Sequence, residues 1–289
     1  MKTILVLLTL LFALLFQGCE ADQPYHTIAA NRWIGYLPFA YANEMGWLQK
    51  DHFILKWTNS LSESKTLFEL GLCQGFCATQ YEVLSAPHIK TKALPYFFID
   101  QSLGADQILS NTSLQKLKKS PLIEVYLELS SVNKALLDSF IKRYRFNKNK
   151  IHLNDTTQDN IVQMKCTKPT LIVTYEPYAT LLRQQGFFVV ASSKTLNSVI
   201  RVYDLFFALS TLPPQKVRPL YESFLKGVRE LQERPRYFYE IIKDYIPHIS
   251  YEKFRQQIKG IRWIEKPTAS DIDYLKAQGF DLSHLLTHR

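Results

Sequence analysis

Short hydrophobic runs of strand length alternate with amphipathic helical patterns from residue 26 to about residue 210. Apolar residues at helical spacing separate the runs, and Pro38, Pro177 and the pair Ser60 and Glu63 are helix-start signals. The runs are "HTIAANRW", "FILKWT", "GFCAT", "LIEVYLEL", "IHLND", "TLIVTYE", "FFVVASS" and "RVYDLFFALS". Further helices are expected at 217–231, 236–246, 251–261 and 269–278. This order predicts an α/β fold with mainly parallel sheets and helices on both faces.

The stretch "YFFIDQSLGADQILSN", residues 96–111, joins a core-like strand to a polar turn that contains glycine. In open α/β sheets, ligands bind beyond the carboxyl ends of the strands. The polar or aromatic segments at such ends are Trp33–Tyr36, Thr79–Glu82, Ser102–Asp106, Leu129–Ser131 and Tyr175–Glu176. We therefore expect these segments to border a binding cleft.

The N-terminus has the pattern of an export signal. Lys2 precedes an apolar run from Ile4 to Phe16, and Gln17-Gly18-Cys19 follows. The run is shorter than the roughly 20 residues of a spanning helix. Residues 1–18 are expected to be a signal peptide, and Cys19 is similar to the lipidated cysteine of bacterial lipoproteins, with 19–24 as a tether. The alternative is an ordinary signal peptide with a chance cysteine.

Composition favours a globular exported chain, with 46% hydrophobic residues, 13% aromatic residues and a net charge of +9. The positive charges are spread out, and "KRYRFNKNK" is their densest patch. Export argues against nucleic acid as a partner, so we expect solvated helix ends or a face that meets an acidic membrane or partner.

Cys73, Cys77 and Cys166 are an odd number, so we expect at least one free thiol or a bond to a partner, with Cys73 and Cys77 as buried thiols. No histidine or acidic residue joins them at metal-ligand spacing. No metal site, cofactor or catalytic group is predicted.

With these pieces in order, the chain resembles the substrate-binding proteins of bacterial ABC importers for nitrate, sulfonates, taurine and thiamine-pyrimidine precursors. The segments that carry the resemblance are "NRWIGYLPFAYANEMGWLQKDHFIL", "ELGLCQGFCATQYEVL", "IDQSLGADQILSNTSLQKLK", "VTYEPYATLLRQQGFFVVASS" and "RVYDLFFAL". Tyr175 and Gln74 stand where the family usually has Trp and Asp, which bears on the ligand rather than on the fold.

The resemblance implies a two-lobed periplasmic-binding-protein fold of the type II-like kind, with two hinge-crossing strands near Phe97–Ser102 and Val202–Phe207. Lobe one would comprise 25–101 and 205–289, including a helical C-terminal segment, and lobe two 102–204. It also implies a monomer, anchored by lipid in the periplasm or at the cell surface, that binds a small molecule and docks on membrane permease subunits.

Each candidate ligand-binding residue also has a structural alternative. Trp33 and Tyr36 could form an aromatic platform or pack the lobes; Glu82 and Asp106 could cap helices; Ser130 and Ser131 could bind an anion at a helix N-terminus or only cap it. The full set is Trp33, Tyr36, Thr79, Glu82, Ser102, Gly104, Asp106, Ser130, Ser131, Tyr175, Glu176, Tyr203 and Asp204.

Acidic residues outnumber basic ones in this set, with Arg32 and Arg201 the nearest cations in sequence. A buried anion needs paired donors or cations, so a nitrogenous or heteroaromatic ligand is favoured over a sulfonate. Two other functions remain open. One is a binding protein that signals to a membrane kinase or cyclase, and the other is an enzyme related to pyrimidine-precursor synthases, which the scattered histidines and the export signal disfavour.

Overall fold

The computed structural model describes residues 24–287. The expected signal peptide and Cys19 lie outside these residues. Within them, every helix is too short or too polar to cross a membrane.

The strands and helices follow the predicted alternation. The strands are β1 (His26–Asn31), β2 (Phe53–Thr58), β3 (Gly75–Thr79), β4 (Ala93–Ser102), β5 (Asp106–Ser110), β6 (Ile123–Leu127), β7 (Ile151–Asp155), β8 (Thr170–Tyr175), β9 (Phe188–Ser192), β10 (Val202–Leu209) and β11 (Ile261–Trp263). The helices are α2 (Leu37–Glu44), α3 (Trp47–Lys50), α4 (Leu61–Glu69), α5 (Gln80–Leu84), α6 (Pro87–Lys90), α7 (Leu114–Lys119), α8 (Val132–Tyr144), α9 (Gln158–Ile161), α10 (Tyr178–Gln184), α11 (Ser193–Leu196), α12 (Pro214–Glu233), α13 (Pro235–Ile242), α14 (Tyr251–Gln257) and α15 (Ala269–Ala277).

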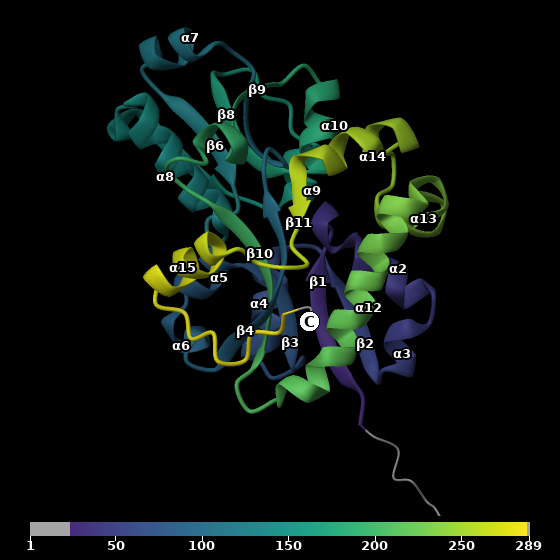
Figure 1. The fold of residues 1–289 in the computed structure, drawn as a ribbon. Coiled ribbons are helices and arrows are strands. Elements are labelled where there is room, and N and C mark those ends of the chain that lie inside the picture. Colours follow the sequence, from purple (N-terminus) through teal and green to yellow (C-terminus); the bar gives the residue numbers. More distant parts are fainter. Residues whose placement is uncertain (1–23, 288–289) are drawn as a thin grey trace, which may run out of the picture.

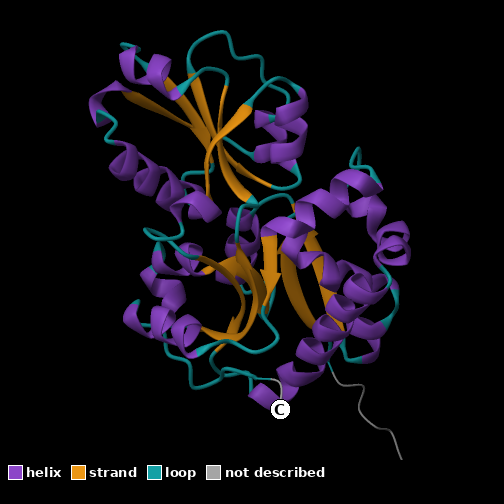
Figure 2. Ribbon diagram, turned by 45° about the horizontal axis from the view of Figure 1, so that its top comes forward, coloured by secondary structure: helices purple, strands orange, loops and turns teal. Residues whose placement is uncertain are grey.

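Two separate sheets organise the molecule (Figures 1 and 2). The six-stranded sheet has the order β11-β4-β10-β3-β1-β2, and the five-stranded sheet has the order β7-β6-β8-β5-β9. We call the parts built on them the first and the second lobe. The C-terminal helices α12 and α13 return to the first lobe and pack on α2.

The expectation of mainly parallel sheets is wrong. The pairs β1–β2, β1–β3, β6–β7 and β6–β8 are parallel, whereas β10 is antiparallel to both β3 and β4, β11 to β4, and β5 to both β8 and β9. The reason is topological, because β4 leads out of the first lobe and β10 leads back into it.

The passages between the lobes lie next to these two strands. Phe97–Ser102 and Val202–Phe207 pair with each other inside the six-stranded sheet, with Asp204 opposite Asp100 and Val202 opposite Ser102. The chain then passes between the sheets at residues 103–105 and 197–201. Ser102 and Val202 therefore stand at the border between the lobes.

Two short strands differ from the sequence-based expectation. Residues 106–110 form β5 rather than the start of a helix, so the helix-cap interpretation of Asp106 is wrong. Residues 261–263 form β11 at the edge of the first sheet, where a helix was expected to end. Both strands are fixed by pairing with distant segments, which local sequence patterns do not record.

An aromatic core holds the first lobe together. The rings of Phe97 on β4 and Phe206 on β10 stack with centroids 5.1 Å apart, and Phe39 of α2 packs 4.7 Å from Phe224 of α12. These side chains are at most 1% exposed. The long returning helix is thereby fixed to the strands that carry Asp100 and Asp204. Cys73 and Cys77 are buried free thiols, as expected.

Candidate functional site

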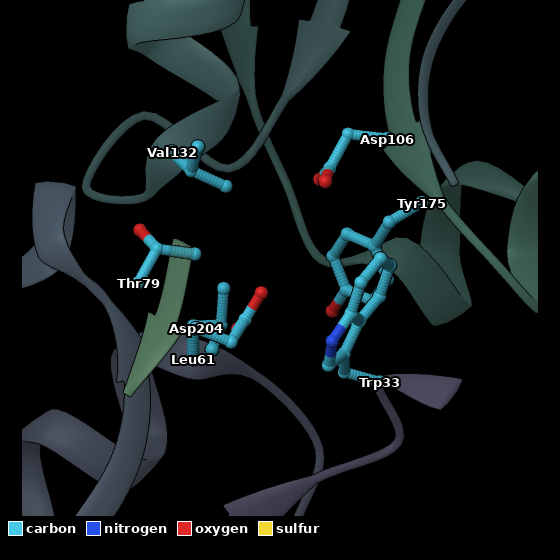
Figure 3. Close-up of a pocket in the computed structure, with 7 residues that line it drawn as sticks. All are labelled: Trp33, Leu61, Thr79, Asp106, Val132, Tyr175 and Asp204. Atoms are coloured by element: carbon cyan, nitrogen blue, oxygen red, sulfur yellow. The ribbon is translucent and has the colours of Figure 1, made fainter. Parts of the chain in front are cut away.

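A small cavity lies where the two lobes meet. Trp33, Leu61, Thr79 and Asp204 line it from the first lobe, and Asp106, Val132 and Tyr175 line it from the second (Figure 3). Five of these seven residues were predicted to be ligand-binding: Trp33, Thr79, Asp106, Tyr175 and Asp204. The sequence pattern did not single out Leu61 and Val132, because apolar residues at helix starts look like core.

The cavity is small, with a volume of about 10 Å³. This is roughly the room that one water molecule requires. In this conformation it can hold one ammonium-sized group, and a larger solute needs the lobes to be further apart.

Trp33 forms the aromatic wall together with Tyr175. The two rings meet edge to face with centroids 5.9 Å apart, and the Tyr175 hydroxyl accepts a hydrogen bond from Asn31 Nδ2 at 3.0 Å. Trp33 Nε1 donates to Asp100 Oδ2 at 3.1 Å. Gly35 makes room for this bond, because a Cβ atom there would lie 1.9 Å from Asp100 Oδ2.

Asp100 and Asp204 form a buried acidic pair on adjacent strands. Their residues are 0% and 2% exposed. Burial raises the pKa of Asp100 to about 8, against the opposing effect of the Trp33 hydrogen bond. The pKa of Asp204 is raised well above its ordinary range by burial and then by the charge of Asp100. Tyr36 was predicted to touch the ligand, but it lies behind the cavity and donates from its hydroxyl to Asp204 Oδ1.

Asp106 points into the cavity from the first residue of β5 (Figure 3). Its backbone N–H donates to Ser102 Oγ at 3.0 Å, which fixes the start of the strand. The side-chain oxygen Oδ2 is buried and has no hydrogen-bond partner among the described residues. Burial, and then the charge of Glu82, raise the pKa of Asp106 to about 7.

Glu82 bridges the lobes instead of lining the cavity. Its Oε2 accepts from the Thr79 N–H at 2.8 Å in a capping box, and its Oε1 accepts from the Val132 N–H at 2.5 Å. Val132 is the first residue of α8, so a carboxyl group of the first lobe occupies the N-terminus of a second-lobe helix. Burial raises the pKa of Glu82. The expected anion position at Ser130 and Ser131 is therefore filled from within the protein.

The remaining predicted residues support this region without lining the cavity. Ser131 caps α8 by accepting from the Asn133 N–H, and Ser130 lies on the exposed rim against Ser62. Glu176 is ion-paired with Arg183 at 2.8 Å. Ser102 and Gly104 both bond to Ser193 at the passage between the lobes, and Tyr203 donates to Asp271 at 2.7 Å.

Besides Asp271, which bonds Tyr203, two buried acids whose pKa values respond to the charges of the site acids were not predicted as site residues. Asp100 follows the apolar run at 96–99 directly and looked like the first residue of a loop, yet β4 continues to Ser102. Glu128 is 4% exposed, and burial followed by the charge of Glu82 raises its pKa to about 8. In both cases the sequence did offer a signal for a buried acid, namely a carboxyl residue directly after an apolar run.

The two cations nearest in sequence are engaged elsewhere. Arg32 pairs with Asp159 at 3.4 Å, and Arg201 donates to Ser270 at 2.9 Å. Among residues 24–287, the cavity lining includes two carboxyl groups and no lysine or arginine. The groups around the cavity are thus arranged to receive hydrogen-bond donors or positive charge.

Comparison with known proteins finds similarity in structure. No family model and no curated protein matches the chain. The zinc-bound ligand-binding component of an ABC-type import system from Staphylococcus aureus superposes with a TM-score of 0.71 at 11% identity, over 89% of this chain and 91% of that one. The alkanesulfonate-binding protein SsuA from Xanthomonas axonopodis pv. citri, bound to MOPS, has a TM-score of 0.70 at 13% identity, over 93% and 100%.

A Candida albicans gene product described as having the generic periplasmic binding protein structural fold matches with a TM-score of 0.63 at 9% identity, covering 89% of this chain and 90% of that one. At identities this low, the likeness concerns the fold alone. The chain has the two-lobed α/β architecture of periplasmic binding proteins, as predicted from its sequence.

Proposed function

We propose that the protein is a solute-binding protein whose two lobes close on a small molecule and deliver it to the membrane permease of an ABC importer. The observation that carries this proposal is the cavity between the lobes. Polar side chains from both lobes meet there, so a ligand would bridge them and favour closure.

The fold and the termini of the strands support this assignment. Ligands of open α/β sheets bind beyond strand ends, and Thr79 and Tyr175 end β3 and β8 while Asp106 begins β5 at the same border. The solved structures with a similar fold include the ligand-binding component of an ABC-type import system and an alkanesulfonate-binding protein. We propose that the second lobe comprises residues 103–201 rather than the expected 102–204, because Ser102 and residues 202–204 pair within the six-stranded sheet of the first lobe. Hinge movement would then occur at the passages beside Ser102 and Val202.

The N-terminal sequence supports a place outside the cytoplasmic membrane. We propose that the signal peptide is removed and that lipid on Cys19 holds the mature chain at the membrane beside its permease. Lipidation is tested by labelling cells with a fatty-acid analogue, which should mark the wild type and leave a Cys19→Ser variant unmarked.

Native mass spectrometry tests the binding function. The mature chain with Cys19 replaced is purified gently from its host. A bound small mass that is lost on unfolding supports the proposal, and a double Asp106→Ala, Glu176→Ala variant should lose it while remaining folded. Protein without bound mass, and without a thermal shift from host metabolite extract, argues against a receptor.

A further inference from the structure

We infer that the cavity takes a small protonated amine, whose ammonium group is held by the carboxyl of Asp106 against the wall formed by Trp33 and Tyr175. This inference rests on the proposed binding function and names its ligand class. It follows from four independent features of the cavity.

The first feature is an acceptor without a donor. Asp106 is 3% exposed, and its Oδ2 has no hydrogen-bond partner among the described residues although it faces the cavity (Figure 3). A buried carboxyl oxygen without a donor costs free energy, which a ligand N–H would remove. The side chain of Asp204 lines the same space, whereas the hydroxyl of Thr79 is turned away and donates to Glu82 Oε2.

The second feature is the charge of the surroundings. Asp100, Asp204 and Glu82 are each at most 2% exposed. The charge of Asp106 raises the pKa values of Asp100 and Asp204, and the charge of Glu82 raises the pKa of Asp106. Arg262, whose charge lowers the pKa of Asp100, is bound to Asp271, and Arg183 is bound to Glu176. An incoming cation therefore favours the ionised forms of these carboxyls and is stabilised by them, whereas an incoming anion opposes their ionisation.

The third feature is the aromatic wall. Trp33 and Tyr175 both line the cavity, and indole and phenol faces attract ammonium groups. The volume of about 10 Å³ matches one ammonium-sized group. A quaternary ammonium would not fit, because it is larger and offers no N–H to Asp106.

The fourth feature is the state of the helix N-terminus that would otherwise receive an anion. The Val132 N–H at the start of α8 donates to Glu82 Oε1. A sulfonate or carboxylate would have to displace this internal carboxyl and then remain beside it. The position that would favour anions is therefore already occupied.

Thermal shift and calorimetry on the mature chain test the inference. The probes are methylammonium, ethanolamine, tetramethylammonium, ethanesulfonate, calcium and zinc, each with sodium chloride at matched ionic strength. Methylammonium or ethanolamine should raise the melting temperature, and the affinity should fall roughly ten- to a hundredfold in Asp106→Asn because one charge-assisted hydrogen bond is lost. The control Asp138→Asn, an exposed acid on α8, should bind as the wild type does.

Proton release provides a second readout. Because the pKa of Asp106 is raised to about 7, an amine that binds its ionised form should release protons near neutral pH, and calorimetry in buffers of different ionisation enthalpy would detect them. The neighbouring groups that could share this release are the carboxyls of Asp100, Asp204 and Glu82, whereas Tyr175 stays protonated because burial raises its pKa well above its ordinary range.

The outcomes separate this inference from the function on which it rests. Stabilisation by ethanesulfonate, tetramethylammonium or a metal ion, with none by the primary amines, would overturn the amine inference and leave the receptor function intact. Amine binding that is unchanged in Asp106→Asn would overturn the assigned position. No binding by the whole panel, together with protein that carries no ligand from its host, would overturn both.

Discussion

Removing the charge of Asp106 should change how the stability of the empty protein depends on pH. The perturbation is Asp106→Asn, which keeps the size of the side chain and abolishes its titration. In the wild type the pKa of this carboxyl is raised from 3.8 to about 7 by burial and by the charge of Glu82. The folded protein therefore holds a proton that the unfolded chain releases above pH 4.

The sign and size follow from this difference. Stability contributed by the protonated carboxyl is fully present below pH 3.8 and is lost as the pH rises to about 7. The loss is about 1.4 kcal/mol per pH unit within this window, and about 4 kcal/mol by pH 8. The variant lacks this loss, so its advantage over the wild type should grow by about 4 kcal/mol from pH 4 to pH 8 and level off above pH 7.

Urea unfolding at half-unit steps from pH 4 to pH 8.5, followed by circular dichroism, measures this difference. The exposed acid Asp138→Asn is the matched control, and its curve should run parallel to that of the wild type. If the curves of Asp106→Asn and wild type are also parallel, the carboxyl titrates alike in both states and the burial argument fails. A saturating amine should flatten the wild-type curve at high pH, because it stabilises the ionised form.

Three further substitutions test other parts of the site. Glu82→Gln turns one of the two carboxyl oxygens that accept from the Thr79 and Val132 N–H groups into a donor, and urea unfolding should show a loss of about 1–3 kcal/mol; an unchanged midpoint would mean that these two hydrogen bonds contribute little to stability. Gly35→Ala places a Cβ against Asp100 Oδ2 and should cost about 1–3 kcal/mol by the same assay, whereas full wild-type stability would contradict the close approach. Arg183→Met leaves the buried Glu176 without its cation and should cost about 2 kcal/mol or more, with the double variant Arg183→Met, Glu176→Gln recovering most of it in a thermal melt; no recovery would show that the arginine acts through packing.

Local sequence patterns predicted most of the elements but not all of their neighbours. The apolar runs of β1, β3 and β8 are long enough to identify strands, and Ser131 caps α8 where the pattern placed a helix start. β5 was missed because "DQILS" is a strand only through its pairing with β8 and β9. The antiparallel course of β10 was missed for the same reason, since direction is a property of topology and not of periodicity.

Most of the residues that line the cavity were named from the sequence because they lie at or just beyond strand ends. Strand ends are visible in a sequence, so Trp33, Thr79 and Tyr175 could be named in advance. Which of two neighbouring acids faces the cavity depends on the pleat of the strand and on bulges, and β10 has register shifts next to Asp204. The bridge from Glu82 to Val132 joins residues 50 positions apart and had no local signal.

The contact between Glu82 and α8 affects the equilibrium between the open and closed states of the proposed receptor. Because this hydrogen bond joins the two lobes of the same chain, it stabilises the closed state whether or not a solute is bound. A more stable shut state leaves fewer molecules open to receive a solute, and apparent affinity falls in proportion to the open fraction. In the proposed receptor, Glu82 would therefore set the equilibrium between the open and closed states, while Asp106 and Trp33 would set the choice of solute, so that capture rate and selectivity could change by separate mutations.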